Sequence, residues 1–138
     1  MKKKLVLLLT FLILIIIMIL ILFIRRNSDR MVNLYDYRLI YSDKFLINST
    51  TDLRIIDEII SNMNLIEEQN SNKVGGFIII EELKGDTIES YRVQGSYITK
   101  EIYKESYENL ISTTYYELSD KYYQLLVDIC DRLRMSIQ

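Results

Sequence analysis

The sequence predicts an α+β protein: an N-terminal transmembrane helix followed by a small antiparallel sheet packed by two helices. Three observations predict this class. One uninterrupted apolar segment lies near the start, short β-branched and aromatic runs alternate with polar turns, and two later segments repeat apolar residues at helical spacing. A chain of 138 residues has room for one domain behind such a helix. We expect the sheet to have about four to six strands.

The apolar segment, Leu5 to Ile24, is predicted to cross a membrane. Thr10 is its only residue that is not strongly apolar. At helical rise the segment spans about 30 Å, which matches the hydrocarbon thickness of a bilayer. Basic side chains that can reach the lipid headgroups flank it on both sides: Lys2, Lys3, Lys4, Arg25 and Arg26.

A cleaved signal peptide is the alternative interpretation of this segment. Its apolar region would run for about 7–15 residues and would end at small residues. Here the run is longer, and the chain contains no alanine. We therefore expect an uncleaved anchor, without ionisable groups of its own, that acts as a passive tether in the lipid bilayer through residues 5–24.

The expected topology has four parts: a short cytoplasmic tail at residues 1–4, the anchor, a linker at 25–34 and an extracytoplasmic α+β domain at 35–138. A short basic tail directly before an apolar run usually stays inside the cytoplasm.

The region after the anchor is acidic. Five of the 17 basic residues and none of the 19 acidic residues precede Ser28, so the remainder carries 12 basic and 19 acidic residues, a net charge of −7. That balance disfavours nucleic acid as a partner, because basic patches bind polyanions.

The first part of the domain is predicted to form a hairpin and a helix. Residues 37–41 and 45–47 are short β-prone runs on either side of a polar turn at 42–44. A helix is expected over 51–63, with a hydroxyl residue at 49–51 as its cap. Its apolar residues recur at helical spacing: Leu53, Ile56, Ile59, Ile60 and Met63.

Strands are predicted next, after a loop marked by the polar stretch 70–72 and by Gly75 and Gly76. Residues 77–80 form a β-branched run that is typical of a central strand. A turn at 84–87 then leads into a strand over 88–94.

Gly95 begins a two-residue turn that closes the next hairpin. Glycine in the first position of such a turn favours type II′. This placement predicts a register in which Val93 pairs with Ile98 and Tyr91 pairs with Lys100.

Residues 101–111 admit two interpretations, which the sequence leaves open. Tyrosines and a leucine recur there at helical spacing, whereas Ile102 and the run at 113–118 fit strands.

The final helix is predicted more clearly. Ser119 is a suitable N-cap, and Leu118 can pack against Tyr123 as a hydrophobic staple. An apolar stripe follows: Tyr122, Leu125, Leu126, Ile129 and Leu133.

Catalytic groups are scarce in this sequence. The chain has no histidine, so histidine-activated nucleophiles are excluded, and its one thiol, Cys130, lies among apolar residues as a small buried hydrophobe would. Zinc, copper and iron–sulfur sites lack ligands. Adjacent carboxylates such as Glu81 and Glu82 would point to opposite faces of a strand. We expect no enzyme activity, no metal and no cofactor.

Tyrosine is the feature most open to a functional interpretation. All 11 tyrosines follow the predicted anchor. Tyrosine combines a rigid apolar ring with a polar tip, which suits recognition surfaces, although it also fills cores and strands. Tyr97, beside the predicted turn, and Tyr115 and Tyr123, one from each doublet, are the candidate partner contacts.

The lysine-rich start and the Ile/Leu-rich segment within Met1 to Arg26 resemble those of small single-pass membrane proteins of unknown function from low-GC Gram-positive bacteria. Some membrane-anchored immunity proteins, which block a toxin outside the membrane, share that layout. The resemblance implies an anchored domain and supplies no site residues. We therefore expect a non-catalytic binding module for a protein partner outside the membrane, of immunity, inhibitor or sensor type; the alternative is a structural subunit of a membrane or envelope complex.

Overall fold

The computed structural model describes residues 2–28, 30–40, 42–67 and 75–137. The chain divides into two compact units, Met1–Arg30 and Met31–Gln138, which are described separately. Stretch 70–72 of the expected loop lies outside the described residues.

The first unit is a single helix, α1 (Lys2–Ser28). Within it, Lys3–Leu22 is long and apolar enough to cross a membrane, and its side chains are not buried against other parts of the chain. A helix of this kind near an N-terminus fits both an anchor and a signal sequence. Leu5 and Ile24, the expected ends of the membrane segment, both lie inside α1.

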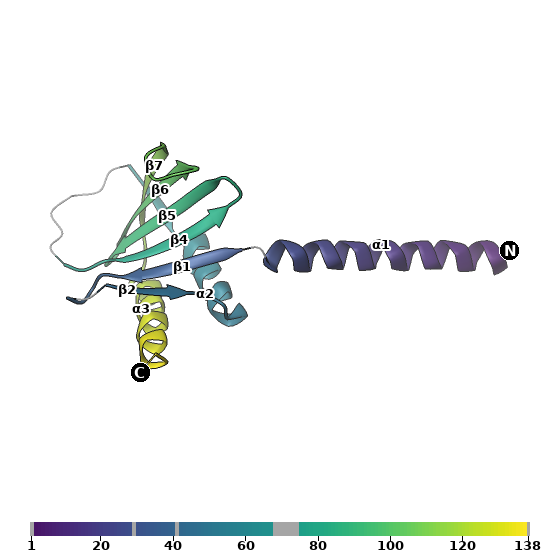
Figure 1. The fold of residues 1–138 in the computed structure, drawn as a ribbon, viewed down its shortest axis with the longest axis horizontal. Helices are drawn as coiled ribbons and strands as arrows, with labels where there is room; N and C mark the ends of the chain where they lie inside the picture. The colour runs from purple at the N-terminus through teal and green to yellow at the C-terminus, as the bar shows by residue number, and fades with distance from the viewer. Residues whose placement is uncertain (1, 29, 41, 68–74, 138) are drawn as a thin grey trace. The chain divides into compact units, whose positions relative to one another are not determined.

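The second unit is α+β and contains an antiparallel sheet (Figure 1). In the described residues the sheet has seven strands in the order β2-β1-β4-β5-β6-β7-β3, more than the expected four to six. The strands are β1 (Met31–Asp36), β2 (Asp43–Leu46), β3 (Asn64–Ile66), β4 (Ile78–Lys84), β5 (Thr87–Gln94), β6 (Tyr97–Lys104) and β7 (Leu110–Glu117).

Two helices, α2 (Thr50–Ser61) and α3 (Asp120–Met135), share one hydrophobic core with the sheet. Their buried residues meet alternate residues of the strands, because successive side chains of a strand point to opposite faces. The core takes Val32, Leu34, Phe45, Ile78, Ile80, Tyr91, Val93 and Ile98 from the sheet, and Ile56, Ile59, Leu126, Ile129 and Cys130 from the helices. Both helices therefore cover the same face of the sheet.

The predicted hairpins around β5 are confirmed. Val93 pairs with Ile98 and Tyr91 pairs with Lys100, and Gly95 has φ 59°, the conformation for which glycine was expected. The helix expected over 51–63 is also present as α2. Ser49 caps it, since its Oγ accepts a hydrogen bond from the backbone N–H of Asp52.

The start of the domain differs from the sequence-based expectation. β1 begins at Met31, inside the expected linker 25–34, and ends at Asp36, before the expected strand 37–41 begins. The sequence does not show the apolar pattern of a strand here, because Asn33 and Asp36 are polar although they are buried. Ile40, expected to be in a strand, is 96% exposed and lies between β1 and β2.

Residues 101–111 form neither a helix nor one continuous strand. β6 continues to Lys104, a short loop follows, and β7 begins at Leu110. Glu105 enters that loop with φ 62°, and the pairing shifts register near Tyr103. The helical spacing of the tyrosines was therefore misleading, because strand pairing with β5 decides the structure.

Candidate functional site

The two faces of the sheet differ in their covering. On one face α2 and α3 cover the core. The opposite face is here called the open face, and it carries the strand residues that alternate with the core residues. β-sheet register places Glu81 between Asn33 of β1 and Ser90 of β5 on the open face. Tyr35 lies opposite Ile79 on the same face. Polar and aromatic side chains therefore meet near the middle of the sheet.

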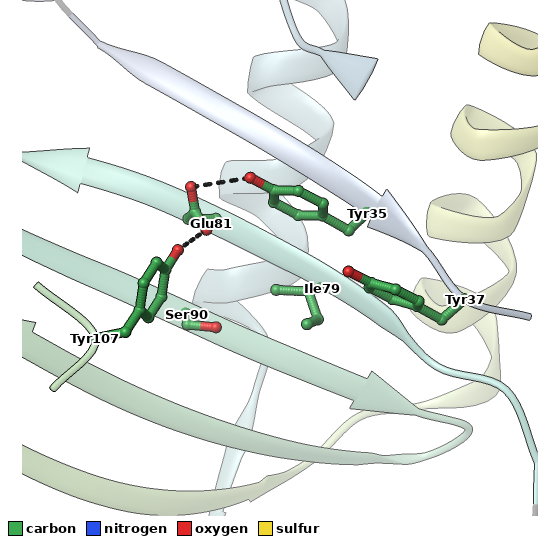
Figure 2. A pocket seen from close by; sticks show the side chains of 6 residues that line it. All are labelled: Tyr35, Tyr37, Ile79, Glu81, Ser90 and Tyr107. Carbon is green, nitrogen blue, oxygen red and sulfur yellow. Dashed lines mark hydrogen bonds between the residues drawn. The ribbon is translucent and has the colours of Figure 1, made fainter. Parts of the chain in front are cut away.

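A pocket of about 280 Å³ lies at this point of the open face. Figure 2 shows Glu81 between the hydroxyl groups of Tyr35 and Tyr107, with Ile79 and Ser90 beside them. The side chains that line the pocket are Tyr35, Tyr37, Ile79, Glu81, Ser90 and Tyr107.

The Glu81 carboxylate is buried, with 8% of the residue exposed. Its Oε1 accepts hydrogen bonds from Tyr35 Oη at 3.3 Å and from Asn33 Nδ2 at 3.4 Å. Both bonds are long for their type, and so they are weak. Its Oε2 accepts a hydrogen bond from Tyr107 Oη. All these donors are neutral groups.

Tyr107 reaches Glu81 from the loop between β6 and β7. The loop is held at its base, where the N–H of Lys104 donates to the carbonyl of Asn109 at 2.9 Å and that of Glu105 donates to the carbonyl of Asp86 at 2.7 Å. The Tyr107 ring packs edge-on against Tyr103, with centroids 5.1 Å apart. Burial, and then the hydrogen bond to Glu81, raise the pKa of Tyr107, so its hydroxyl remains a donor.

Aromatic rings around the pocket also contact cations of the chain itself. Lys44 Nζ lies 5.2 Å from the centre of the Tyr35 ring, and Arg92 Cζ lies 4.7 Å from that of Phe77. Neither cation lines the pocket. Rings on this part of the open face are thus positioned to bind positive charge.

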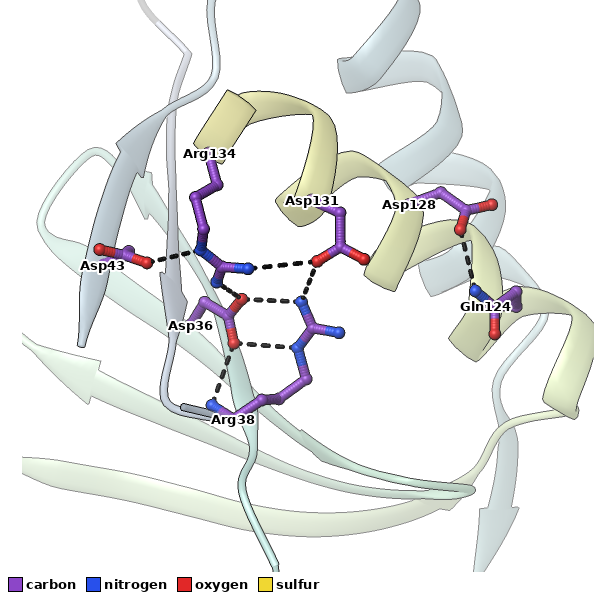
Figure 3. A network of polar contacts seen from close by, with 7 residues as sticks. All are labelled: Asp36, Arg38, Asp43, Gln124, Asp128, Asp131 and Arg134. Atoms are coloured by element: carbon purple, nitrogen blue, oxygen red, sulfur yellow. Dashed lines mark hydrogen bonds and ion pairs between the residues drawn. The ribbon is translucent and has the colours of Figure 1, made fainter. Parts of the chain in front are cut away.

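A second polar cluster joins the ends of β1 and α3 (Figure 3). Asp36 is fully buried and accepts hydrogen bonds from Arg38 Nε at 2.9 Å and Nη2 at 2.8 Å, and from Arg134. Asp131 accepts from Arg38 at 2.8 Å, and Asp43 accepts from Arg134 at 2.9 Å. Arg38 bridges two carboxylates and Arg134 contacts three, since it also donates to Asp131, so this cluster explains how α3 is fixed to the sheet edge.

A third cluster surrounds Glu89 on the helix-side face of β5. Lys84 and Lys100 both pair with Glu89 at 3.2 Å, and the hydroxyl of Tyr91 donates to it at 2.6 Å. Burial works to raise the pKa of Glu89, but the bonds from Tyr91 and the two lysines lower it overall. This carboxylate is neutralised within the domain.

The structure places two of the three tyrosines expected to contact a partner on the sheet and the third on a helix. Tyr97 and Tyr115 lie on the open face, because their neighbours Ile98 and Tyr116 pair on the core side. Tyr123 lies on α3 and packs against the core. None of the three lines the pocket.

The residues that do line the pocket were not singled out by the sequence as a group. A charged residue that follows the β-branched run of β4 was one available signal, since Glu81 and Glu82 continue that strand. They point to opposite faces, as their adjacency predicted. The tyrosine partners of Glu81 could not be identified, because Tyr107 lies 26 positions away and Tyr35 lies 46 positions away.

Cys130 is buried in the core, and burial raises its pKa to about 12. Within the part of the chain that the structure describes, no three His, Cys, Asp or Glu residues gather closely enough to hold a metal ion.

No protein-family model, curated protein or solved structure matches the chain.

Proposed function

We propose that the chain is a membrane-anchored, non-catalytic binding module that presents the open face of its sheet to a protein partner outside the cytoplasm, in the manner of an immunity protein, an inhibitor or a sensor. The pocket over Glu81 carries this proposal. It gathers a buried carboxylate and tyrosine rings on the face that the helices leave uncovered. Tyrosine-rich, rigidly mounted sites of this kind are common at recognition surfaces.

The reactive groups of the chain favour binding over catalysis. There is no histidine to act as a general base. A thiol attacks as its thiolate, and the raised pKa of Cys130 opposes thiolate formation inside the core. The same holds for the Tyr107 hydroxyl, whose raised pKa keeps it protonated.

The anchored topology has its own test. Gln124 is exposed on α3, whereas Cys130 is buried, so a Gln124→Cys variant offers one accessible thiol in the folded domain. A membrane-impermeant thiol reagent should label it in intact cells. Protection in intact cells with labelling after lysis would place the domain in the cytoplasm and contradict this part of the proposal.

The function itself is tested by crosslinking in intact cells with the full chain and with a variant whose Leu5–Ile24 segment is replaced by an unrelated apolar helix. A binding module should give the same protein adduct in both, because α1 only tethers it. The alternative, a structural subunit of a membrane or envelope complex, requires α1 to pack against its neighbours, so the replacement would abolish the adduct. Substrate turnover without any adduct would overturn the binding proposal.

A further inference from the structure

We propose that the pocket over Glu81 binds an organic cation, an alkylammonium or guanidinium group, between the tyrosine rings and the carboxylate. This deepens the proposed function of the open face and rests on it only for the source of the cation. The charge of the pocket, its aromatic walls and its size support this assignment.

Glu81 differs in its charged partners from the other buried carboxylates of the described residues. Asp36 pairs with Arg38 and Arg134, Asp52 pairs with Arg132, and Glu82 pairs with Lys84. Within the described ranges, no lysine or arginine forms an ion pair with Glu81; its partners are an amide and two hydroxyls. A buried charge is strongly favoured by a partner of opposite charge. The pocket beside Glu81 provides the place for one.

The walls of the pocket are suited to a cation. The rings of Tyr35 and Tyr37 lie nearly parallel, with centroids 6.5 Å apart and an angle of 14°. Tyr107 lies on the opposite side of Glu81 from Tyr35 (Figure 2). Aromatic faces attract ammonium and guanidinium groups through the ring quadrupole, and cages of several rings recognise alkylated ammonium ions. Lys44 already makes such a contact with Tyr35, a ring that lines the pocket, and Arg92 makes one with Phe77.

The pocket volume is sufficient for a small group. At about 280 Å³ it is smaller than the roughly 300–1,000 Å³ typical of sites for drug-sized ligands. It suits the head of one lysine or arginine side chain, or one small amine. An anion is disfavoured by Glu81 and by the net charge of −7 on the region after Ser28.

The test is a titration of the isotope-labelled full chain in detergent micelles, followed by NMR. The probes are tetramethylammonium and methylguanidinium, with tert-butanol as an uncharged molecule of similar size and sodium chloride as the control for ionic strength. The reporters are the backbone amide signals of Ile79 and Ser90, which line the pocket. Saturable shifts are expected with the two cations only, with a Kd on the order of 1 mM.

Matched variants identify the group responsible. Glu81→Gln keeps the shape and removes the charge, and it should weaken cation binding about tenfold or more. Glu101→Gln is the control, because Glu101 also lies on the open face and accepts a tyrosine hydrogen bond, from Tyr103 at 2.6 Å, but does not line the pocket. Should Glu81→Gln fail to fold, Tyr37→Leu removes a wall ring and leaves the hydrogen bonds of Glu81 intact. It should weaken binding several-fold, whereas Tyr97→Leu should not.

Each outcome bears on the proposal. Binding that depends on Glu81, together with a partner adduct that Glu81→Gln abolishes, assigns the cation to a side chain of the partner. If cation binding depends on Glu81 but the partner adduct is unchanged or absent, the cation is a free amine or guanidine. In that case the cation site stands, and only the protein partner is in question. Equal binding of tert-butanol, or equal affinities in the wild type, Glu81→Gln and Tyr37→Leu, would overturn the cation site.

Discussion

The hydroxyl of Tyr107 donates a hydrogen bond to Oε2 of Glu81, which joins the loop between β6 and β7 to the middle of β4. One wall of the pocket therefore stands on a loop, whereas the others stand on strands β1, β4 and β5 or directly follow β1. We therefore expect the integrity of the site to depend on this contact across the open face.

Replacing Tyr107 with Phe tests that contact, because the ring stays and only the hydroxyl is lost. Glu81 would keep its two long hydrogen bonds, and the unfolding free energy should fall by about 1 kcal/mol. Amide hydrogen exchange in residues 104–109 should become faster. Tyr103→Phe is the matched control, since its partner Glu101 is not buried. Equal exchange in the loop of wild type and Tyr107→Phe would show that this hydrogen bond does not hold the loop.

The cluster at the end of α3 predicts a larger effect on stability. Asp36 is fully buried between Arg38 and Arg134, so Asp36→Asn removes the buried carboxylate from two partly buried guanidinium groups and leaves them only more exposed acidic partners, Asp131 for both and Asp43 for Arg134. Chemical denaturation should show a loss of about 2–3 kcal/mol, below the full value for a buried pair because both arginines are partly exposed. Asp43→Asn is the control: its side chain is 37% exposed, and the loss should be under about 1 kcal/mol. Similar losses in both variants would contradict this ranking.

The same carboxylate predicts how stability depends on pH. Burial works to raise the pKa of Asp36, but hydrogen bonds from the side chain and backbone of Arg38, and from Arg134, lower it below its ordinary value of 3.8. The unfolded chain therefore binds this proton more readily. The stabilisation is present above pH 3.8 and is lost as the pH falls through the lower pKa of the folded state.

Denaturation at a series of pH values measures this loss. Wild type should lose stability on acidification below about pH 4, and Asp36→Asn should lose less over the same range. Glu89→Gln should also flatten the curve, since the pKa of Glu89 is lowered in the folded state. Parallel curves for wild type and both variants would show that neither carboxylate contributes.

Cys130 provides a probe of folding. Burial, and then the nearby charge of Asp36, raise its pKa to about 12, so at pH 8 the folded domain should hold it as a protonated, inaccessible thiol. An aromatic disulfide reagent should react with it slowly in the native chain and rapidly in denaturant. Rapid reaction of the native chain at pH 8 would contradict the placement of Cys130 in the core.

The sequence predicted those parts of the fold that local chemistry decides. Gly95 specified the β5–β6 turn and its register, and the spacing of Ile56 and Ile59 specified α2. β1 was missed because Asn33 and Asp36 are polar, and their burial is compensated by distant residues, Glu81 and Arg134. β3 was missed because three residues become a strand only by pairing with β7.

The sequence indicated the type of residue at the candidate site but not the individual residues that form it. Tyrosine was the expected contact residue, and Tyr97 and Tyr115 do lie on the open face. The pocket itself uses Tyr35, Tyr37 and Tyr107 instead. Strand order brings β1 beside β4, and the β6–β7 loop folds back to Glu81; neither fact follows from periodicity or turn chemistry.

Recognition through the open face can be tested by site-specific photocrosslinking of the full chain in intact cells. A photoreactive amino acid at Arg92, which is exposed beside the pocket residue Ile79 on the open face, is compared with one at Gln124, exposed on α3. Recognition through the open face predicts a protein adduct from position 92 and a weak adduct or none from position 124. Adducts from position 124 alone, or equally from both, would contradict recognition through the open face.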